Sequence, residues 1–403
     1  MNLKILPILL AFLVMGVADA MGPLSSHVQS NPVMAALMPF FVFIAFAACS
    51  VPGGLLAARI GKKNLMLLGL GLNTVAVAVP TFMNPPFGLL LACILLLGVG
   101  TTFLQVAGNP IVRDLSDQGG YSRNLAMAQG IKGVGSTAMS ALSTAGISLA
   151  FLPFLKAMDW RGVFPIFFVL MALAFVSVSV LKVHETKADV PPSIGSSLAL
   201  LGNPVFAFAV LGIFLYVGAE VCMATFLQPT IEGYGFSPNE AAWIGPVGFF
   251  GSLAFGRIVA GSVKVSPHTF FRLSAFLGLV GLALIMSRVK EVALAGIICG
   301  GLGFANIWPM LFSITVEEKP ECANELSGLM CMAIAGGALV PLAMGKVISH
   351  GLEQLKDKSA WVMTDGTMVT LAFLVPAACF AYLLLLSLVK KAKKPSAPVP
   401  VTA

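Results

Sequence analysis

The feature that most constrains the fold is a series of long apolar segments that follow one another along almost the whole chain. About twelve of them have the length of roughly 20 residues that a helix needs to cross a bilayer. Their approximate ranges are 5–24, 33–58, 65–82, 87–112, 125–152, 162–182, 204–227, 239–262, 270–287, 292–316, 325–349 and 366–389. Only 10% of the residues are charged, against about 25% in a soluble domain. The sequence therefore predicts an all-α membrane protein with about twelve transmembrane helices.

One linker and the loop charges predict how these spans are arranged. The segment 184–202 contains Pro191-Pro192 and separates six spans from six. We therefore expect an N-terminal bundle at 1–183, a C-terminal bundle at 203–389 and a tail at 390–403. With the N-terminus inside, the inner loops and tail carry about 15 Lys and Arg residues and the outer loops about 7. The positive-inside rule then predicts that both termini are cytoplasmic, in the inner membrane of a bacterium.

The first apolar segment also resembles a cleavable signal peptide, because Ala18-Asp19-Ala20 has the form of a cleavage site. Asp19 would lie within that motif, and removal of the segment would leave an odd number of spans. We therefore expect the segment to be retained as the first helix. The net charge of +7 is expected to face anionic lipid headgroups, not nucleic acid.

The chemistry-bearing residues exclude several function classes. The seven cysteines and four histidines are scattered without the spacing of metal ligands or of a disulfide framework. No Ser/His/Asp constellation lies within the spans, and the loops are too short to hold a catalytic domain. We therefore expect neither an enzyme nor a bound metal or cofactor.

Two amides stand out inside the fourth span, in the stretch LGVGTTFLQVAGNP at 97–110. Gln105 and Asn109 are four residues apart and share one helical face, and Pro110 follows. Amides in hydrocarbon must find partners in protein, ions or ligand. They either hold two helices together or line a solute pathway.

The polar features of the two halves recur at an offset of about 200 residues. Four features recur: a glycine followed by an acid, an amide before a proline, an asparagine at the start of a helix, and a later pair of glycines. The matching sets are Gly16 to Asp19 with Gly218 to Glu220, Asn109-Pro110 with Asn306 and Pro309, Asn124 with Asn324, and Gly133 and Gly135 with Gly336 and Gly337. A repeat of two six-helix halves places a binding site near the membrane midplane, between the halves.

Four charged residues fall inside predicted spans and at least five residues from either end: Asp19, Lys132, Glu220 and Arg257. On an insertion scale each would cost about 3 kcal/mol if it stayed unpaired. They must therefore pair, face the interior or line water. Arg257 lies near the inner end of its helix, where we expect its side chain to reach the membrane surface. Asp19 and Lys132 can form an ion pair, either structural or part of a proton pathway.

The loop after the second span, GGLLAARIGKKN, resembles the G-x-x-x-D-R-x-G-R/K-R/K signature of the major facilitator superfamily. Gly54, Arg59, Gly61, Lys62 and Lys63 match this gating loop, whereas Ala58 replaces the acid. That departure weakens a gating ion pair based on the acid. The resemblance implies two pseudo-symmetric six-helix bundles.

A closer resemblance is to the fucose:proton symporter and glucose/galactose transporter family. It rests on ADAMGPL around Asp19, LQVAGNP, YVGAEVCMATFL at 216–227, FANIWPMLFS at 304–313 and SGLMCMAIAGGALVPLAMG at 327–345. The resemblance implies that Asp19 carries the coupling proton. Gln105 stands where the family has a second acid, and an amide cannot titrate. Gln129 is kept, and Lys132 stands where Asn is expected, so Lys132 either neutralises Asp19 or binds an anionic sugar.

We therefore predict a secondary active transporter that moves a sugar or sugar derivative with a cation by alternating access. Asp19 and Glu220 are the predicted coupling residues, and the coupling ion is H+ or Na+. The predicted substrate-binding residues are Gln105, Asn109, Gln129, Lys132, Asn306 and Trp308. Trp308 would either stack on a sugar face or fill space. The alternatives are a carrier of organic anions or drugs, and a non-transporting sensor on a carrier fold. We expect a monomer in the lipid bilayer.

Overall fold

The computed structural model describes residues 5–28, 32–145, 158–183, 185, 193–244, 248–354 and 366–389. The tail at 390–403 and the linker residues 184 and 186–192 lie outside these described residues. In the N-terminal half the helices are α1 (Leu6–Asp19), α2 (Met21–Val28), α3 (Pro32–Ile60), α4 (Lys62–Phe82), α5 (Phe87–Asp114), α6 (Tyr121–Ala145), the 3-10 helix η2 (Asp159–Val163) and α8 (Phe164–Val180).

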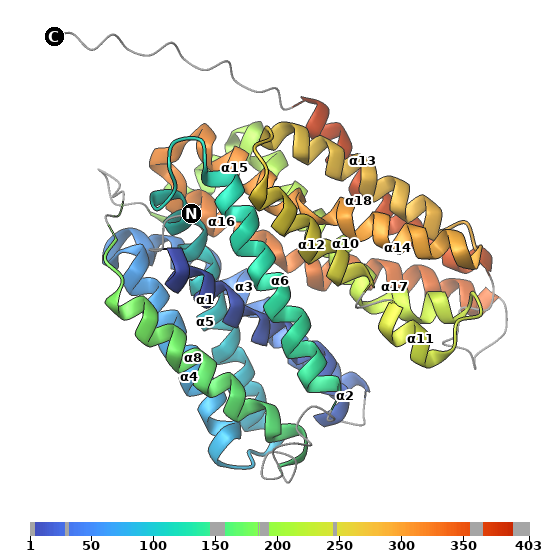
Figure 1. Ribbon diagram of the computed structural model, residues 1–403, viewed down its shortest axis with the longest axis horizontal. Coiled ribbons are helices and arrows are strands. Elements are labelled where there is room, and N and C mark those ends of the chain that lie inside the picture. The colour runs from blue at the N-terminus through green and yellow to red at the C-terminus, as the bar shows by residue number, and fades with distance from the viewer. Residues whose placement is uncertain are drawn as a thin grey trace.

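The second half begins with two short helices, α9 (Ile194–Ala199) and the 3-10 helix η3 (Leu200–Gly202). The longer elements that follow are α10 (Pro204–Glu232), α11 (Pro238–Trp243), α12 (Phe249–Ser262), α13 (Pro267–Ile285), α14 (Lys290–Ala305), α15 (Ile307–Glu318), η5 (Pro320–Cys322), α16 (Ala323–Met332), η6 (Ala333–Ala335), α17 (Gly336–Gln354) and α18 (Gly366–Val389). Figure 1 shows the two halves side by side as separate groups of helices.

The described parts of all twelve predicted spans fall on helices. Nine helical segments among the described residues are long and apolar enough to cross a membrane. The other three predicted spans are 5–24, formed by α1 and α2, 125–152, described as α6 up to residue 145, and 239–262, described as α11 and α12. Among the described residues, the first span is interrupted at Ala20, the tenth at Asn306 and the eleventh at η6.

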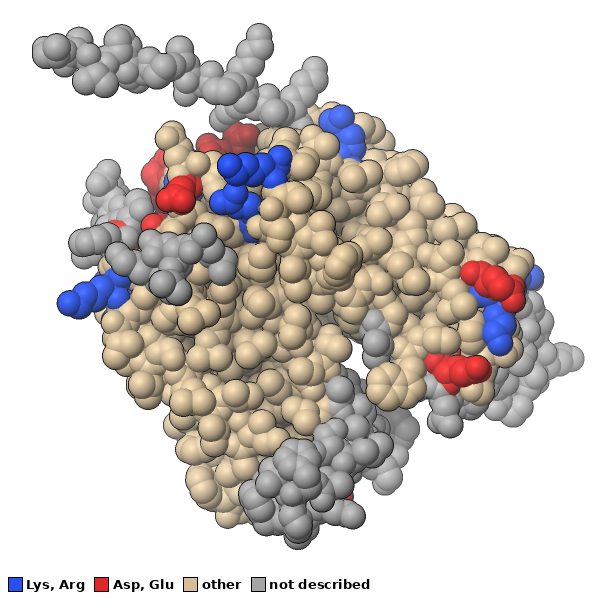
Figure 2. Space-filling model, in the orientation of Figure 1, with Lys and Arg blue, Asp and Glu red and all other residues tan. Residues whose placement is uncertain are grey.

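The outer helices show why the composition suits a bilayer. On α8 the residues Val169, Leu173, Val176 and Val180 form one stripe and are each more than half exposed. The opposite stripe, Phe167, Met171, Ala174 and Val178, is fully buried. A helix that is apolar on both faces belongs against protein on one side and lipid on the other. Figure 2 shows the described charged side chains gathered at two opposite ends of the molecule, with a broad uncharged band between them.

Glycines allow the helices of each half to cross closely, in the same way in both halves. An added Cβ at Gly135 of α6 would lie 2.1 Å from the carbonyl oxygen of Leu13 in α1. In the second half, an added Cβ at Gly336 would lie 2.0 Å from the carbonyl oxygen of Phe214 in α10. Both pairs of residues are offset by about 200 positions. The repeated glycines are therefore close-packing positions, where any side chain would force the helices apart.

The two halves meet at one end of the molecule and diverge at the other. α3 and α5 pack against α16, and α6 packs against α12. At this end an added Cβ at Gly54 of α3 would lie 2.6 Å from the carbonyl oxygen of Asn324 in α16. At the opposite end, α2 packs on α3 and α6, and α11 packs on α10, each within its own half. Figure 1 shows these two helices apart, and Figure 2 shows the molecule indented between them.

Candidate functional site

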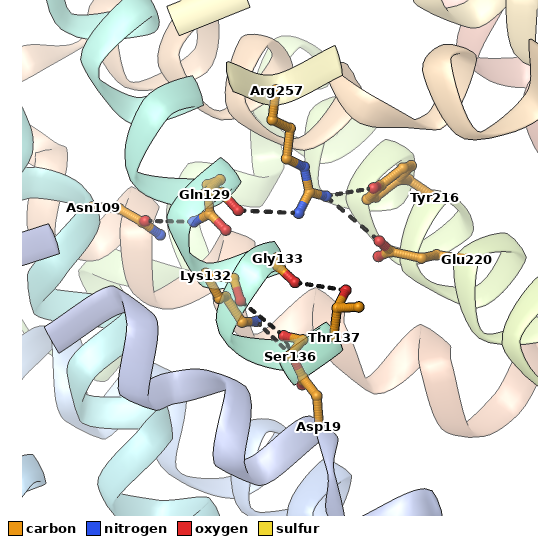
Figure 3. Close-up of polar contacts among 10 residues, drawn as sticks. All are labelled: Asp19, Asn109, Gln129, Lys132, Gly133, Ser136, Thr137, Tyr216, Glu220 and Arg257. Atoms are coloured by element: carbon orange, nitrogen blue, oxygen red, sulfur yellow. Dashed lines mark hydrogen bonds and ion pairs between the residues drawn. The ribbon is translucent and has the colours of Figure 1, made fainter. Parts of the chain in front are cut away.

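A group of polar and charged side chains lies between the halves, contributed by α1, α6, α10 and α12 (Figure 3). It contains two ion pairs. Lys132 Nζ lies 3.7 Å from Asp19 Oδ2, and Arg257 NH2 lies 3.5 Å from Glu220 Oε1. All four charges that the sequence places inside spans are thus paired. In each pair a carboxylate from the first span of a half meets a base from another helix of the same half.

Asp19 is the most accessible of the four. Its side chain is 45% exposed, and it closes α1 at the point where the first span is interrupted. Ser136 Oγ, one turn beyond Lys132 on α6, lies 2.5 Å from Asp19 Oδ2 and donates a hydrogen bond to it. Asp19 is therefore held by one hydroxyl and one more distant ammonium group, and its carboxylate remains partly accessible to water.

Glu220 is held more firmly, because Arg257 is fixed by several bonds. Arg257 is only 6% exposed. Its Nε donates to the carbonyl oxygen of Ala305 at 2.9 Å, and its NH2 group donates to the hydroxyl of Tyr216 at 2.9 Å and to Glu220. The expectation that Arg257 reaches the membrane surface is wrong. Its side chain instead points inward, because the carboxylate and the carbonyl compensate for its burial.

The amides on α5 and α6 connect to this group. Gln129 Nε2 donates to Asn109 Oδ1 at 3.1 Å, and the backbone carbonyl of Gln129 accepts from Arg257 NH1 at 3.4 Å. Asn109 also approaches the Cys331 sulfur of α16 at 3.9 Å. Gln129 is 2% exposed and Asn109 is fully buried. Hydrogen bonds from α6 therefore reach α5 in their own half and α12 in the other half.

Each proline of the repeat leaves a carbonyl oxygen without its usual helical donor, and a side chain donates a hydrogen bond to that oxygen instead. Proline lacks the N–H that would bond the carbonyl four residues earlier. In α5, Pro110 thereby releases the carbonyl oxygen of Val106, which accepts from Ser327 Oγ of α16 at 2.7 Å. In the second half, Pro309 releases the carbonyl oxygen of Ala305, which is the acceptor of Arg257 Nε. The first of these bonds joins the two halves of the protein.

Three predicted substrate-binding residues, Gln105, Asn306 and Trp308, are covered by protein. Gln105 is 1% exposed, Asn306 5% and Trp308 4%. Asn306 Nδ2 donates to the carbonyl oxygen of Gly256 at 3.3 Å. Among the described residues, no partner is found for Gln105 Oε1, Asn306 Oδ1 or Trp308 Nε1. Trp308 packs beside Phe312 with ring centroids 5.8 Å apart, so its face is not presented to solvent in this arrangement.

The gating loop lies at the end where the halves meet. Gly61 joins α3 to α4 with φ of +93°, a conformation that favours glycine. Lys62 and Lys63 begin α4, and their backbone N–H groups donate to the Glu185 carboxylate at 2.6 and 2.8 Å. That carboxylate satisfies two free donors of the helix N-terminus. The exposed Arg59, together with Glu185, lines a cavity of about 440 Å³ beside this loop.

Two ion pairs near this loop were not anticipated from the sequence. Lys62 Nζ pairs with Asp114 Oδ2 at 2.5 Å, and both side chains are almost fully buried. Arg113 Nε pairs with Glu317 Oε1 at 2.6 Å and so connects α5 to α15 across the halves. The adjacent Arg113-Asp114 at the end of the fourth span is the signal that could have indicated them. With Ala58 in place of the acid, charge pairing at this end comes from these residues.

Among the described residues, no three His, Cys, Asp or Glu side chains gather in a way that could hold a metal ion. The site consists instead of paired charges, amides and hydroxyls between two helical halves. Residues 6–341 match the model of the Major Facilitator Superfamily. The chain belongs to this superfamily. That membership confirms the predicted two-bundle fold and the prediction of an integral membrane transporter rather than an enzyme.

The similar proteins match this chain over most of its length. It is 27% identical over 370 residues to a glucose/galactose transporter of Brucella abortus, covering 88% of this chain and 85% of that protein. It is 24% identical over 383 residues to an L-fucose-proton symporter of Haemophilus influenzae, covering 86% and 85%. A crystal structure of the Escherichia coli fucose:proton symporter FucP superposes with a TM-score of 0.79 at 20% identity, covering 97% of this chain and 100% of that one.

Proposed function

We propose that this protein is a secondary active transporter that couples entry of a sugar or sugar derivative to movement of protons. The names of the similar glucose/galactose and fucose-proton carriers support the substrate class and the coupling ion. The single observation that carries the proposal is the half-exposed Asp19 carboxylate, which faces Lys132 at 3.7 Å between the two halves. A carboxylate that can be reached by water and balanced by a base can bind and release a proton during transport.

In the proposed cycle, Asp19 is the residue that takes up the proton. Protonation removes its negative charge and weakens its attraction to Lys132, which loosens the contact between α1 and α6. Glu220 is the second candidate for coupling, but Arg257 holds it with a buried guanidinium group. The amides Gln129 and Asn109 are the proposed contacts for sugar hydroxyls, because amides both donate and accept hydrogen bonds.

We propose that the two halves rock against each other about this central group, with the linker at 184–202 between them. The arrangement in which α3 and α5 pack on α16 is the state closed at the end of the gating loop. By the positive-inside rule this end is the cytoplasmic one, so the state faces outward. Opening to the cytoplasm requires separation of Arg113 from Glu317 and of Ser327 from the Val106 carbonyl. Gating is thus assigned to contacts that exist in only one of the two states.

A carrier of organic anions is the second candidate function. The accessible cation Lys132 favours it, since its side chain is 18% exposed beside Asp19. A drug or other apolar anion would also need an apolar surface next to that cation.

The test uses purified protein in liposomes. We expect Asp19→Asn to abolish uptake driven by a pH gradient while sparing exchange of substrate across the membrane, because the neutral side chain mimics the protonated state. The control is Asp117→Asn, an exposed carboxylate in the loop between α5 and α6. Uphill uptake by the Asp19 variant would show that coupling lies elsewhere, and dependence on a sodium gradient alone would refute proton coupling.

A further inference from the structure

The charges of the central site sum to zero in the described state. Asp19 on α1 and Glu220 on α10 contribute two negative charges, and Lys132 on α6 and Arg257 on α12 contribute two positive charges. The other titratable groups that face them are the Tyr216 hydroxyl and the Cys331 thiol, which are ordinarily neutral. α5 presents the amide of Asn109. The only change of charge that proton uptake by Asp19 produces is therefore from zero to plus one.

The two bases of this site differ in what they would do after that change. Arg257 keeps all of its partners, since the Ala305 carbonyl, the Gln129 carbonyl, the Tyr216 hydroxyl and Glu220 are unaffected. Lys132 Nζ has Asp19 as its ion-pair partner, at a distance longer than a hydrogen bond. Protonation of Asp19 therefore removes the ion-pair partner of Lys132, whereas Arg257 keeps Glu220 as its partner. Its 18% exposure places it within reach of a ligand.

From this balance of charge we infer that the substrate carried together with the proton is an anionic sugar with one carboxylate, such as a hexuronate, and that Lys132 binds that carboxylate. The inference rests on the proposed proton-coupled sugar transport and names its substrate class. The carboxylate replaces Asp19 as the partner of Lys132 when Asp19 takes up its proton. The sugar hydroxyls then face the amide of Gln129, next to Lys132 along α6, and the amide of Asn109 on α5, to which Gln129 donates (Figure 3).

This arrangement also explains how uncoupled movement is prevented. The empty site and the site loaded with a proton and a monoanion both have a net charge of zero. A site holding only the proton has a net charge of plus one, and a site holding only the anion has minus one. An unbalanced charge is costly in a site closed off from water. Only the empty and the fully loaded carrier therefore change their orientation readily, as symport requires.

The transported pair of a proton and a monoanion carries no net charge, and this gives a direct test. The purified full-length protein is placed in liposomes and assayed for counterflow of radiolabelled D-glucuronate and D-galacturonate against D-glucose and D-galactose. We expect exchange of a hexuronate and not of the neutral hexoses. Uptake of the hexuronate should follow an imposed pH gradient and should not change when valinomycin and potassium impose a membrane potential, negative inside.

The variant Lys132→Gln tests the assigned residue, with Lys132→Arg to retain the charge. Loss of a charge-assisted hydrogen bond should lower hexuronate uptake by about tenfold or more. We expect Lys132→Arg to keep most of the uptake and the exposed Lys264→Gln, used as the control, to keep all of it. Thermal stability in detergent, measured for each variant, separates loss of binding from loss of folding.

Two outcomes would overturn the inference, and they are distinguishable. Exchange of a neutral hexose, with uptake stimulated by the membrane potential, would refute the anionic substrate and leave proton-coupled sugar transport standing. Exchange of none of the four sugars under any gradient would refute sugar transport itself. Unchanged hexuronate uptake by a stable Lys132→Gln protein would refute the role of Lys132.

Discussion

The bond between Ser327 and the Val106 carbonyl offers a sharp test of how the two halves are held together. It joins α16 to α5 at 2.7 Å across the halves, and both partners are fully buried. Because Pro110 removes the usual helical donor for this carbonyl, no backbone group of α5 replaces the hydroxyl. Replacement Ser327→Ala therefore leaves a buried acceptor without a partner. Such a group costs about 1–3 kcal/mol.

The cost should fall on one conformation only. When the halves separate at this end, water reaches the Val106 carbonyl, and the absence of the hydroxyl then matters little. Ser327→Ala should therefore raise the free energy of the state described here, relative to the state open at this end, by about 1 kcal/mol, the lower end of that range. A difference of that size changes the ratio of the two conformations about fivefold.

The assay measures the distance between the halves at the same end. Spin labels are placed at Asp117, which follows α5, and at Glu321, which follows α15. Both residues are exposed. Introduced as non-canonical amino acids, the labels leave the seven native cysteines in place. Pulsed electron resonance should show the long-distance population grow in Ser327→Ala. Ser313→Ala is the matched control, because its buried hydroxyl bonds only the Met310 carbonyl of its own helix. An unchanged distance distribution in a stable Ser327→Ala protein would refute the reasoning.

Two further replacements test packing and buried charge. Gly135→Ala would place a methyl group 2.1 Å from the Leu13 carbonyl and should lower the thermal midpoint in detergent sharply, whereas Gly22→Ala, with open space around it, should not; equal midpoints would contradict the close crossing. Lys62→Met removes the buried ammonium group that pairs with the Asp114 carboxylate, and the loss of one partner of a buried ion pair costs about 3–5 kcal/mol. Adding Asp114→Leu should recover most of that loss, and failure to recover it would show that the pair does not act as a unit.

Much of the architecture is predictable from the sequence because it depends on local properties of single helices. A run of about 20 apolar residues crosses the bilayer regardless of which helix packs beside it. The recurrence at about 200 residues, seen in Gly16 and Gly218, indicates two equivalent halves before any contact is known. A carboxylate such as Asp19, placed in the first of these spans, needs a partner or water. Its role in coupling remains a prediction.

The directions of Arg257 and Ser327 were decided only by the tertiary structure, whereas the Asp19–Lys132 ion pair was already considered from the sequence. Arg257 was expected to reach the membrane surface, and it instead lies buried on the Ala305 carbonyl, 48 positions away in the chain. Ser327 was given no role of its own in the sequence, and its acceptor, the Val106 carbonyl, lies 221 positions away. Apolar length and periodicity are properties of one helix, whereas the partner that makes a buried polar group stable comes from a distant segment. The sequence therefore determined that the chain is a two-part membrane carrier, and the packing of its helices determined which partners its buried polar side chains meet.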